Sequence, residues 1–172
     1  MTDSSVSKPF WQTKSLNEMT RDEWESLCDG CAKCCLNKFI DDESTDEATE
    51  LLPTNYIDEG EQVVYSSIAC FLLNDKSCQC TKYAQRTTLV PDCVQLTQDN
   101  LDAVFFMPPS CTYRRLQEGR GMPSWHPLLH KGKKSAMHKS GMSVRGKIVK
   151  DSDVELEDFE DYIVLWPLND ID

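Results

Sequence analysis

Hydrophobic and polar positions near the start of the chain predict one short helix with an apolar face. The segments at 15–18 (SLNE) and 20–23 (TRDE) both have the Ser/Thr-x-x-Glu spacing of a capping box. Trp24 and Leu27 follow three positions apart, so they share one side of a helix. We therefore predict a short helix that runs through Trp24 and ends at about Leu27.

Two further helices are indicated in the second half of the chain. A brief helix beginning at position 99 or 100 must end before Pro108, because proline disfavours helical backbone at the residue before it. Ser110 is suited to N-cap a helix over residues 111–118, and Gly119 is suited to end it.

Alternating apolar and polar positions predict two short strands, at 143–149 and 161–165. No internal repeat is visible, and a length of 172 residues fits one domain. The hydrophobic set makes up 40% of the chain and includes nine cysteines, so ordinary apolar side chains are scarce for a core. We expect a small single domain of the α+β class, with short helices and a few strands organised around a cysteine-rich metal centre.

The chain contains no apolar run long enough to span a membrane, and its first twenty residues contain no apolar signal-peptide region. We therefore expect a cytoplasmic protein that does not contact membranes. Thiols stay reduced in that compartment, so nine cysteines, an odd number, indicate metal binding rather than disulfides.

Two acidic segments account for the net charge of -11. Residues 41–61 and residues 151–172 each carry nine acidic side chains and no Lys or Arg, whereas residues 131–150 carry seven basic side chains and no acid. The first acidic stretch has the composition of an exposed loop or a poorly ordered insertion. The second is either a solvated end of the chain or a tail that folds back on the basic block.

The basic block at 131–150 could contact nucleic acid through phosphates. It lacks interleaved aromatic residues, and the chain around it is acidic. We therefore do not expect nucleic acid as the partner, and the sequence identifies no protein partner.

The densest chemical feature is the segment Cys28-Asp-Gly-Cys31-Ala-Lys-Cys34-Cys35. A C-x2-C pair chelates metals because a tight turn brings both sulfurs to one ion, and Gly30 suits such a turn. The run C-x2-C-x2-C also opens the bacterial ferredoxin pattern for iron–sulfur clusters, but here Cys35 follows at once and the usual ending is missing. The fourth ligand must be Cys35 or a cysteine from elsewhere.

The remaining cysteines lie farther along the chain, at Cys70, Cys78, Cys80, Cys93 and Cys111. Cys111 lies in a predicted helix, where we expect it to be buried as a small hydrophobic residue. Nine cysteines would accommodate two sites of four thiols with one left over. Thiolates suit zinc and iron alike, so the metal stays open at this point.

Histidines offer a second source of ligands. His126 and His130 are four positions apart and form either a ligand pair or packing residues, and we expect His138 in the basic block to be solvated. No nucleotide-binding loop, Ser-His-Asp arrangement or two-histidine protease motif is present, so the sequence identifies no catalytic residue.

In these features the chain resembles the bacterial CxxCxxCC cysteine-cluster family, and within it the YcgN-like group. The resemblance covers about residues 9–150. It rests on the ordered motifs Pro9-Phe-Trp-Gln12, Trp24-Glu-Ser-Leu-Cys-Asp-Gly-Cys31, Cys34-Cys35-Leu36, Cys70, Cys78-Gln-Cys80, Tyr83, Arg86, Pro91-Asp-Cys93, Cys111-Thr-Tyr-Arg114, Trp125-His-Pro-Leu128 and Ser143-Val-Arg145.

The resemblance implies a zinc- or iron-chelating domain over residues 1–150, with an acidic insertion at about 44–64 and a separate acidic C-terminal segment at 151–172. Where the family has a proline after the arginine of its C-x2-Y-x2-R pattern, this chain has Thr87, and Cys93 falls farther along. Cys78 and Cys111 look like additions of the subgroup. The implied metal ligands are Cys28, Cys31, Cys34, Cys35, Cys70, Cys80 and Cys93.

Three functions remain open after this comparison. The first is a cytoplasmic protein that chelates zinc or iron. The second is an iron–sulfur redox component, or one associated with a methylase, since flagellin lysine methylases have a similar cysteine pattern. The third is a module that binds a partner or nucleic acid through residues 131–150.

Overall fold

The longest strands pair next to the cysteine segment. In the computed structural model, which describes residues 7–41, 62–101 and 106–172, β1 (Leu36–Asp41) lies antiparallel to β2 (Gln62–Ala69). The short strand β5 (Val149–Lys150) joins β2 in parallel, which gives the strand order β1-β2-β5. A separate hairpin pairs β3 (Leu73–Asn74) with β4 (Gln79–Cys80).

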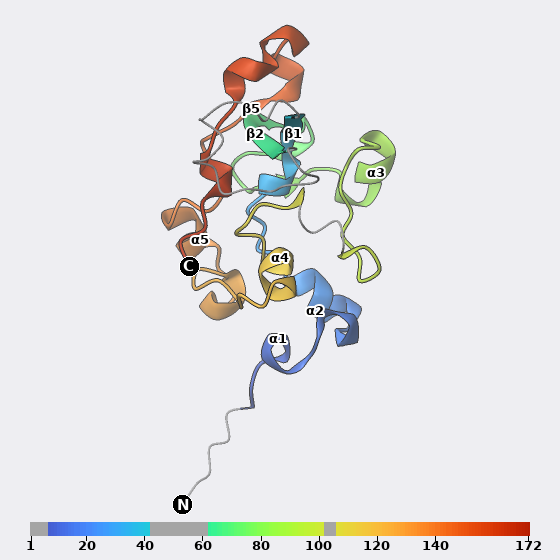
Figure 1. Cartoon of the computed structure of the whole chain (residues 1–172), viewed down its shortest axis with the longest axis vertical. Helices are drawn as coiled ribbons and strands as arrows, with labels where there is room; N and C mark the ends of the chain where they lie inside the picture. Colours follow the sequence, from blue (N-terminus) through green and yellow to red (C-terminus); the bar gives the residue numbers. More distant parts are fainter. Residues whose placement is uncertain (1–6, 42–61, 102–105) are drawn as a thin grey trace, which may run out of the picture.

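The helices are short, and in Figure 1 the α-helices lie below and to the right of the three-stranded sheet. None of them, in the part of the chain that is described, is long and apolar enough to cross a membrane. The described residues form short helices and a few mainly antiparallel strands, so the predicted α+β class is confirmed. The α-helices are α1 (Phe10–Thr13), α2 (Arg21–Ser26), α3 (Arg86–Leu89), α4 (Thr112–Gln117) and α5 (Ser135–Lys139). The 3-10 helices are η1 (Leu16–Glu18), η2 (Lys33–Cys35), η4 (Tyr83–Gln85), η6 (Pro127–His130), η7 (Asp151–Asp153), η8 (Leu156–Tyr162) and η9 (Trp166–Leu168).

The predicted N-terminal helix is confirmed as α2. Both capping boxes form: the Thr20 side chain accepts from the backbone N–H of Glu23, whose carboxylate accepts in return from Thr20 N–H at 2.8 Å. Trp24 and Leu27 are buried against Tyr113 of α4, with the Trp24 and Tyr113 ring centroids 4.7 Å apart. Figure 1 shows α2 and α4 side by side.

The helix predicted over residues 111–118 is confirmed as α4, but its cap is not the predicted one. Cys111 occupies the N-cap position, and the Ser110 hydroxyl instead accepts a hydrogen bond from Lys33 Nζ at 2.8 Å. Gly119 ends the helix at φ +72°, with its N–H donating to the Leu116 carbonyl. Of the helix predicted from position 99 or 100, residues 102–105 lie outside the described residues.

Both strands predicted from alternation are wrong. Over 143–149 the chain turns at Gly146, whose φ is +73°, so only Val149 reaches a strand. Over 161–165 the helix η8 continues to Tyr162, and a single bridge joins Ile163 to Ser66 of β2. Of the predicted acidic insertion, residues 44–61 lie outside the described residues, and residues 62–64 belong to β2.

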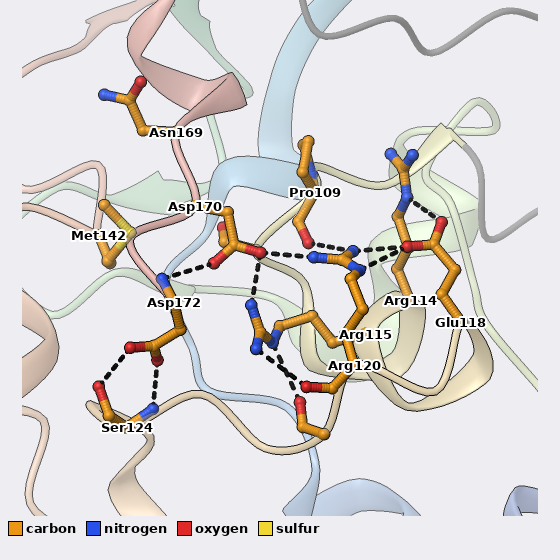
Figure 2. A network of polar contacts seen from close by, with 12 residues as sticks. Pro109, Arg114, Arg115, Glu118, Arg120, Ser124, Met142, Asn169, Asp170 and Asp172 are labelled. Carbon is orange, nitrogen blue, oxygen red and sulfur yellow. Dashed lines mark hydrogen bonds and ion pairs between the residues drawn. The ribbon is translucent and has the colours of Figure 1, made fainter.

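The acidic C-terminal tail packs on the body of the protein. Asp170 Oδ2 accepts from Arg115 Nη1 and from Arg120 Nη1, both at 2.5 Å, and the Asp172 carboxylate accepts from Ser124 (Figure 2). The tail therefore does fold back, but Asp170 pairs with Arg115 of α4 and with Arg120 just after it, and not with the block 131–150.

Aromatic and aliphatic residues complete the docking of the tail. Lys147 lies over the ring of Trp166, with Nζ 4.7 Å from the centroid, and Leu168 is buried in the core beside Val63 and Tyr65 of β2. This contact places one member of the basic block against an aromatic ring. The expectation of a wholly solvated end is therefore wrong.

Candidate metal centre

The cysteine segment forms a tightly curled loop between α2 and β1. The Cys31 N–H donates to Asp29 Oδ1 at 2.8 Å, which closes a turn over Gly30. Gly30 has a φ of +72° and Ala32 a φ of +65°, so the backbone reverses twice within a few residues. The Cys31 carbonyl accepts from Val144 N–H at 3.1 Å, which fixes the loop to the distant segment 143–149.

Gly30 is required for a second reason. A Cβ at this position would collide with the Lys134 side chain, whose ammonium lies directly against the Gly30 backbone. Lys134 thereby approaches Cys28 closely enough for its charge to favour the Cys28 thiolate. The predicted turn-forming role of Gly30 is confirmed, and its lack of a side chain also admits a cation to the loop.

A cavity of about 40 Å³ lies between this loop and the start of α4. Four cysteines line it: Cys28, Cys31 and Cys34 from the loop, and Cys111 from the N-cap of α4. Cys28 and Cys34 are exposed to solvent, whereas Cys31 and Cys111 are buried. The volume exceeds what a single water molecule needs, so a metal ion also fits.

Two buried polar atoms at this cavity have no hydrogen-bond partner among the described residues: Asp29 Oδ2 and Thr112 Oγ1. Asp29 is 4% exposed and Thr112 is 1% exposed, so bulk water does not satisfy them. An unpaired buried carboxylate oxygen is costly unless a cation lies beside it. Thiols, a carboxylate and an unused hydroxyl around one cavity fit a thiophilic metal ion such as zinc or iron.

A second group consists of three thiols where strands begin or end, together with Cys93, which follows α3. Cys70 N–H donates to the Cys35 carbonyl at 3.0 Å, because β1 and β2 pair at Leu36 and Ala69. Cys80 is on β4, and its charged form raises the pKa of both Cys70 and Cys93, behind the larger effect of burial. We call Cys35, Cys70, Cys80 and Cys93 the strand-end thiols, and Cys28, Cys31, Cys34 and Cys111 the cavity thiols.

Cys78 belongs to neither group. It is buried in the core cluster beside Leu73 and Val144, and its Sγ lies 3.8 Å from the Asp75 carbonyl. Its φ of +54° belongs to the turn of the β3–β4 hairpin.

Neighbouring thiols differ in how readily they ionise. The Cys35 thiol donates a hydrogen bond to Cys34, which lowers the pKa of Cys34 and raises the pKa of Cys35. Burial raises the pKa of Cys31 and of Cys111, with the Asp29 carboxylate as the next contribution. Desolvation by surrounding protein also raises the pKa of Cys28, although that residue is partly open to solvent.

Within the described residues, no three Cys, His, Asp or Glu side chains are already arranged to hold a metal ion. All nine cysteines lie in this part of the chain and are free. Cysteine thiols turn between staggered χ1 rotamers without backbone movement, so ligation here requires side-chain rotation of the residues that line the cavity.

The histidines do not provide a ligand pair. His126 is fully buried; its Nδ1 accepts from Leu128 N–H at 3.0 Å, and its Nε2 lies 3.0 Å from the Leu27 carbonyl. Both ring nitrogens are therefore used in packing, and His130 Nε2 contacts the Ser124 carbonyl. His138 is half-buried, with Nδ1 2.7 Å from Ser143 Oγ, so the expectation of a solvated residue is wrong.

Lysines next to the thiols are residues that the sequence patterns did not single out. Lys33 is fully buried, and its Nζ donates to Ser110 Oγ and, at 3.4 Å, to the Asn169 carbonyl. Burial lowers the pKa of Lys33, and the negative forms of Cys31 and Asp29 oppose that change. Lys38 Nζ donates to the Cys34 carbonyl at 3.0 Å. The one sequence signal that could have identified these polar residues is that each lies next to a cysteine: Asp29, Lys33 and Thr112.

Comparison with known proteins agrees with this description. Residues 27–112, which contain all nine cysteines, match the CxxCxxCC family, described as "Putative zinc- or iron-chelating domain". A UPF0260 protein of Shewanella oneidensis is 49% identical over 95% of this chain and 99% of its own length, and UPF0260 proteins of Shewanella amazonensis and Shewanella denitrificans are 50% and 48% identical over the same shares.

No solved structure matches the chain. The resemblance stated from the sequence is confirmed, both by the family match and by relatives that align over nearly the whole length. On this evidence the chain belongs to the CxxCxxCC family, and its relatives are UPF0260 proteins.

Proposed function

We propose that this protein binds zinc or iron through cysteine thiolates in a reducing compartment, the cytoplasm. The observation that carries the proposal is the thiol-lined cavity with a buried, unpartnered carboxylate oxygen of Asp29. The ligands that we propose from the family pattern are Cys28, Cys31, Cys34, Cys35, Cys70, Cys80 and Cys93.

The bound metal supplies a positive charge that holds several thiolates together, and the protein's own residues prepare the loop for it. Backbone turns at Gly30 and Ala32 curl the loop, and Asp29 fixes the direction of the Cys31 N–H. Four thiolates around one divalent ion leave a charge of about -2. Lys33 and Lys134 lie near these thiols and offset part of it.

Zinc and iron are separated by a spectrum of protein prepared without air. An iron–sulfur cluster gives a brown protein whose visible absorbance is bleached by dithionite. A zinc protein is colourless and has no visible absorbance to bleach. Metal quantification on the same sample tests the proposal itself. Less than about half an ion per chain contradicts it, because a thiolate site of this kind holds its metal through purification.

We do not propose nucleic acid as a ligand of residues 131–150. Several bases of this block are engaged within the protein: Lys134 against Gly30, Lys147 on the Gly141 carbonyl and Lys150 on the Phe71 carbonyl. We propose instead that residues 1–150 form the metal-binding unit, with the acidic insertion at about 44–64, and that residues 151–172 form a segment that buttresses it.

A further inference from the structure

We propose that the cavity between the cysteine loop and α4 is a self-contained metal site whose four thiolate ligands are Cys28, Cys31, Cys34 and Cys111. This inference rests on the proposed function and deepens it. It adds Cys111, which the family pattern leaves out of the ligand set, and it separates these four residues from the strand-end thiols.

The position of Cys111 opposite the loop is fixed by packing on both sides. Tyr113, two residues later, donates its hydroxyl to the Trp24 carbonyl at 2.7 Å and thereby holds α4 against α2. Ser110, one residue earlier, accepts from the buried ammonium of Lys33 at 2.8 Å. Both bonds connect the flanks of Cys111 to the flanks of the loop, so the fourth thiol is held in place before any metal binds.

Polar atoms beside these thiols indicate a cation. Asp29 has one carboxylate oxygen on the Cys31 N–H and the other buried without a partner among the described residues. A disulfide or a neutral ligand in this cavity would leave that oxygen uncompensated, whereas a divalent ion compensates it. The Thr112 hydroxyl, also unpartnered in the described part of the chain, can donate a hydrogen bond to a metal-bound thiolate.

The strand-end thiols do not line this cavity. Cys34 and Cys35 are adjacent in sequence, but only Cys34 lines the cavity, while Cys35 is joined to Cys70 through the β1–β2 pairing. The adjacent pair therefore serves both groups, one thiol each. Cys78 remains as the cysteine outside both.

The test compares Cys111→Ser with Cys78→Ser. Both residues are buried, at 8% and 4% exposure, so both substitutions put one hydroxyl into the interior. Each chain is purified without air with the metal it retains, and is then reconstituted with cobalt(II) alone. The readouts are ions per chain and the sulfur-to-cobalt charge-transfer absorbance. Circular dichroism of each variant monitors the fold.

We expect Cys111→Ser either to lose about one ion per chain or to keep that ion with one thiolate ligand fewer, which removes about a quarter of its charge-transfer absorbance. We expect Cys78→Ser to match the wild type in both readouts. Equal retention and equal absorbance in the two variants would overturn the assignment of Cys111. A wild-type chain that retains no zinc or iron and binds no cobalt would instead overturn the proposed function itself.

A second variant keeps the test valid if Cys111→Ser fails to fold. Asp29→Asn keeps the acceptor for the Cys31 N–H and removes only the charge. We expect its affinity for cobalt to fall about tenfold, as for other groups that support metal ligands. An unchanged affinity would show that no cation lies beside Asp29 and would contradict the proposed site.

Discussion

The salt bridges of Asp170 allow a quantitative test of how the tail stabilises the protein. We consider Asp170→Asn, which keeps the shape of the side chain and removes its charge. Asp170 Oδ2 accepts from both Arg115 and Arg120 at 2.5 Å (Figure 2), and the side chains of Asp170 and Arg115 are only 14% and 5% exposed.

The expected loss follows from the burial of Arg115. Removing one partner of a buried pair costs about 3–5 kcal/mol, because it leaves a charge without compensation. Arg115 keeps two other contacts, through Nε to the Gly121 carbonyl and through Nη2 to the Arg120 carbonyl, and Arg120 is 33% exposed. We therefore expect the free energy of unfolding to fall by about 2 kcal/mol, less than for a fully buried pair. This loss lowers the Tm by about 4–8 °C in a chain of this size.

The assay is urea unfolding with a reductant present, at a fixed metal load, and the control is Glu157→Gln. Glu157 is an exposed acid of the same tail, so its substitution changes the net charge equally. We expect the control to lose less than about 0.5 kcal/mol. Equal unfolding free energies for the two variants would refute the role that we assign to the Asp170 pairs.

Other predictions concern the loop and its supports. Burial lowers the pKa of His126, whose neutral ring accepts the Leu128 N–H at Nδ1. Its contribution to stability is complete above about pH 6.5 and declines as the pH falls below that value. His126→Gln should make this decline smaller without removing it, because burial also lowers the pKa of His138; a decline unchanged from the wild type would assign it to other groups. Gly30→Ala should cost about 1–2 kcal/mol for its positive φ, as should Gly119→Ala at the same φ of +72°. Only Gly30→Ala should also weaken cobalt binding, because it displaces Lys134; equal cobalt affinities in the two variants would contradict this.

Local patterns predicted those elements whose signals lie within a few residues. Helix α2 was predicted from the capping box at Thr20 and the apolar pair Trp24 and Leu27. The end of α4 was predicted from Gly119. Strands β1 and β2 were not predicted, because their stability depends on pairing across residues 42–61. The alternation at 143–149 was misleading, since Gly146 turns the chain there.

The same distinction applies to the candidate site. The spacing of Cys28, Cys31 and Cys34 predicts a chelating loop, because these residues are close in sequence. Cys111 instead reaches the cavity through the packing of α4 on α2, which no short pattern encodes. Its burial was predicted correctly, but burial alone did not distinguish a core residue from a ligand.

The central claim, that cysteine thiolates bind zinc or iron, is tested most directly by metal analysis of the intact chain purified without air. The account predicts at least about one zinc or iron per chain, retained through gel filtration and released when the thiols are blocked. Less than about half an ion per chain, in protein whose thiols are titrated as reduced, would contradict it.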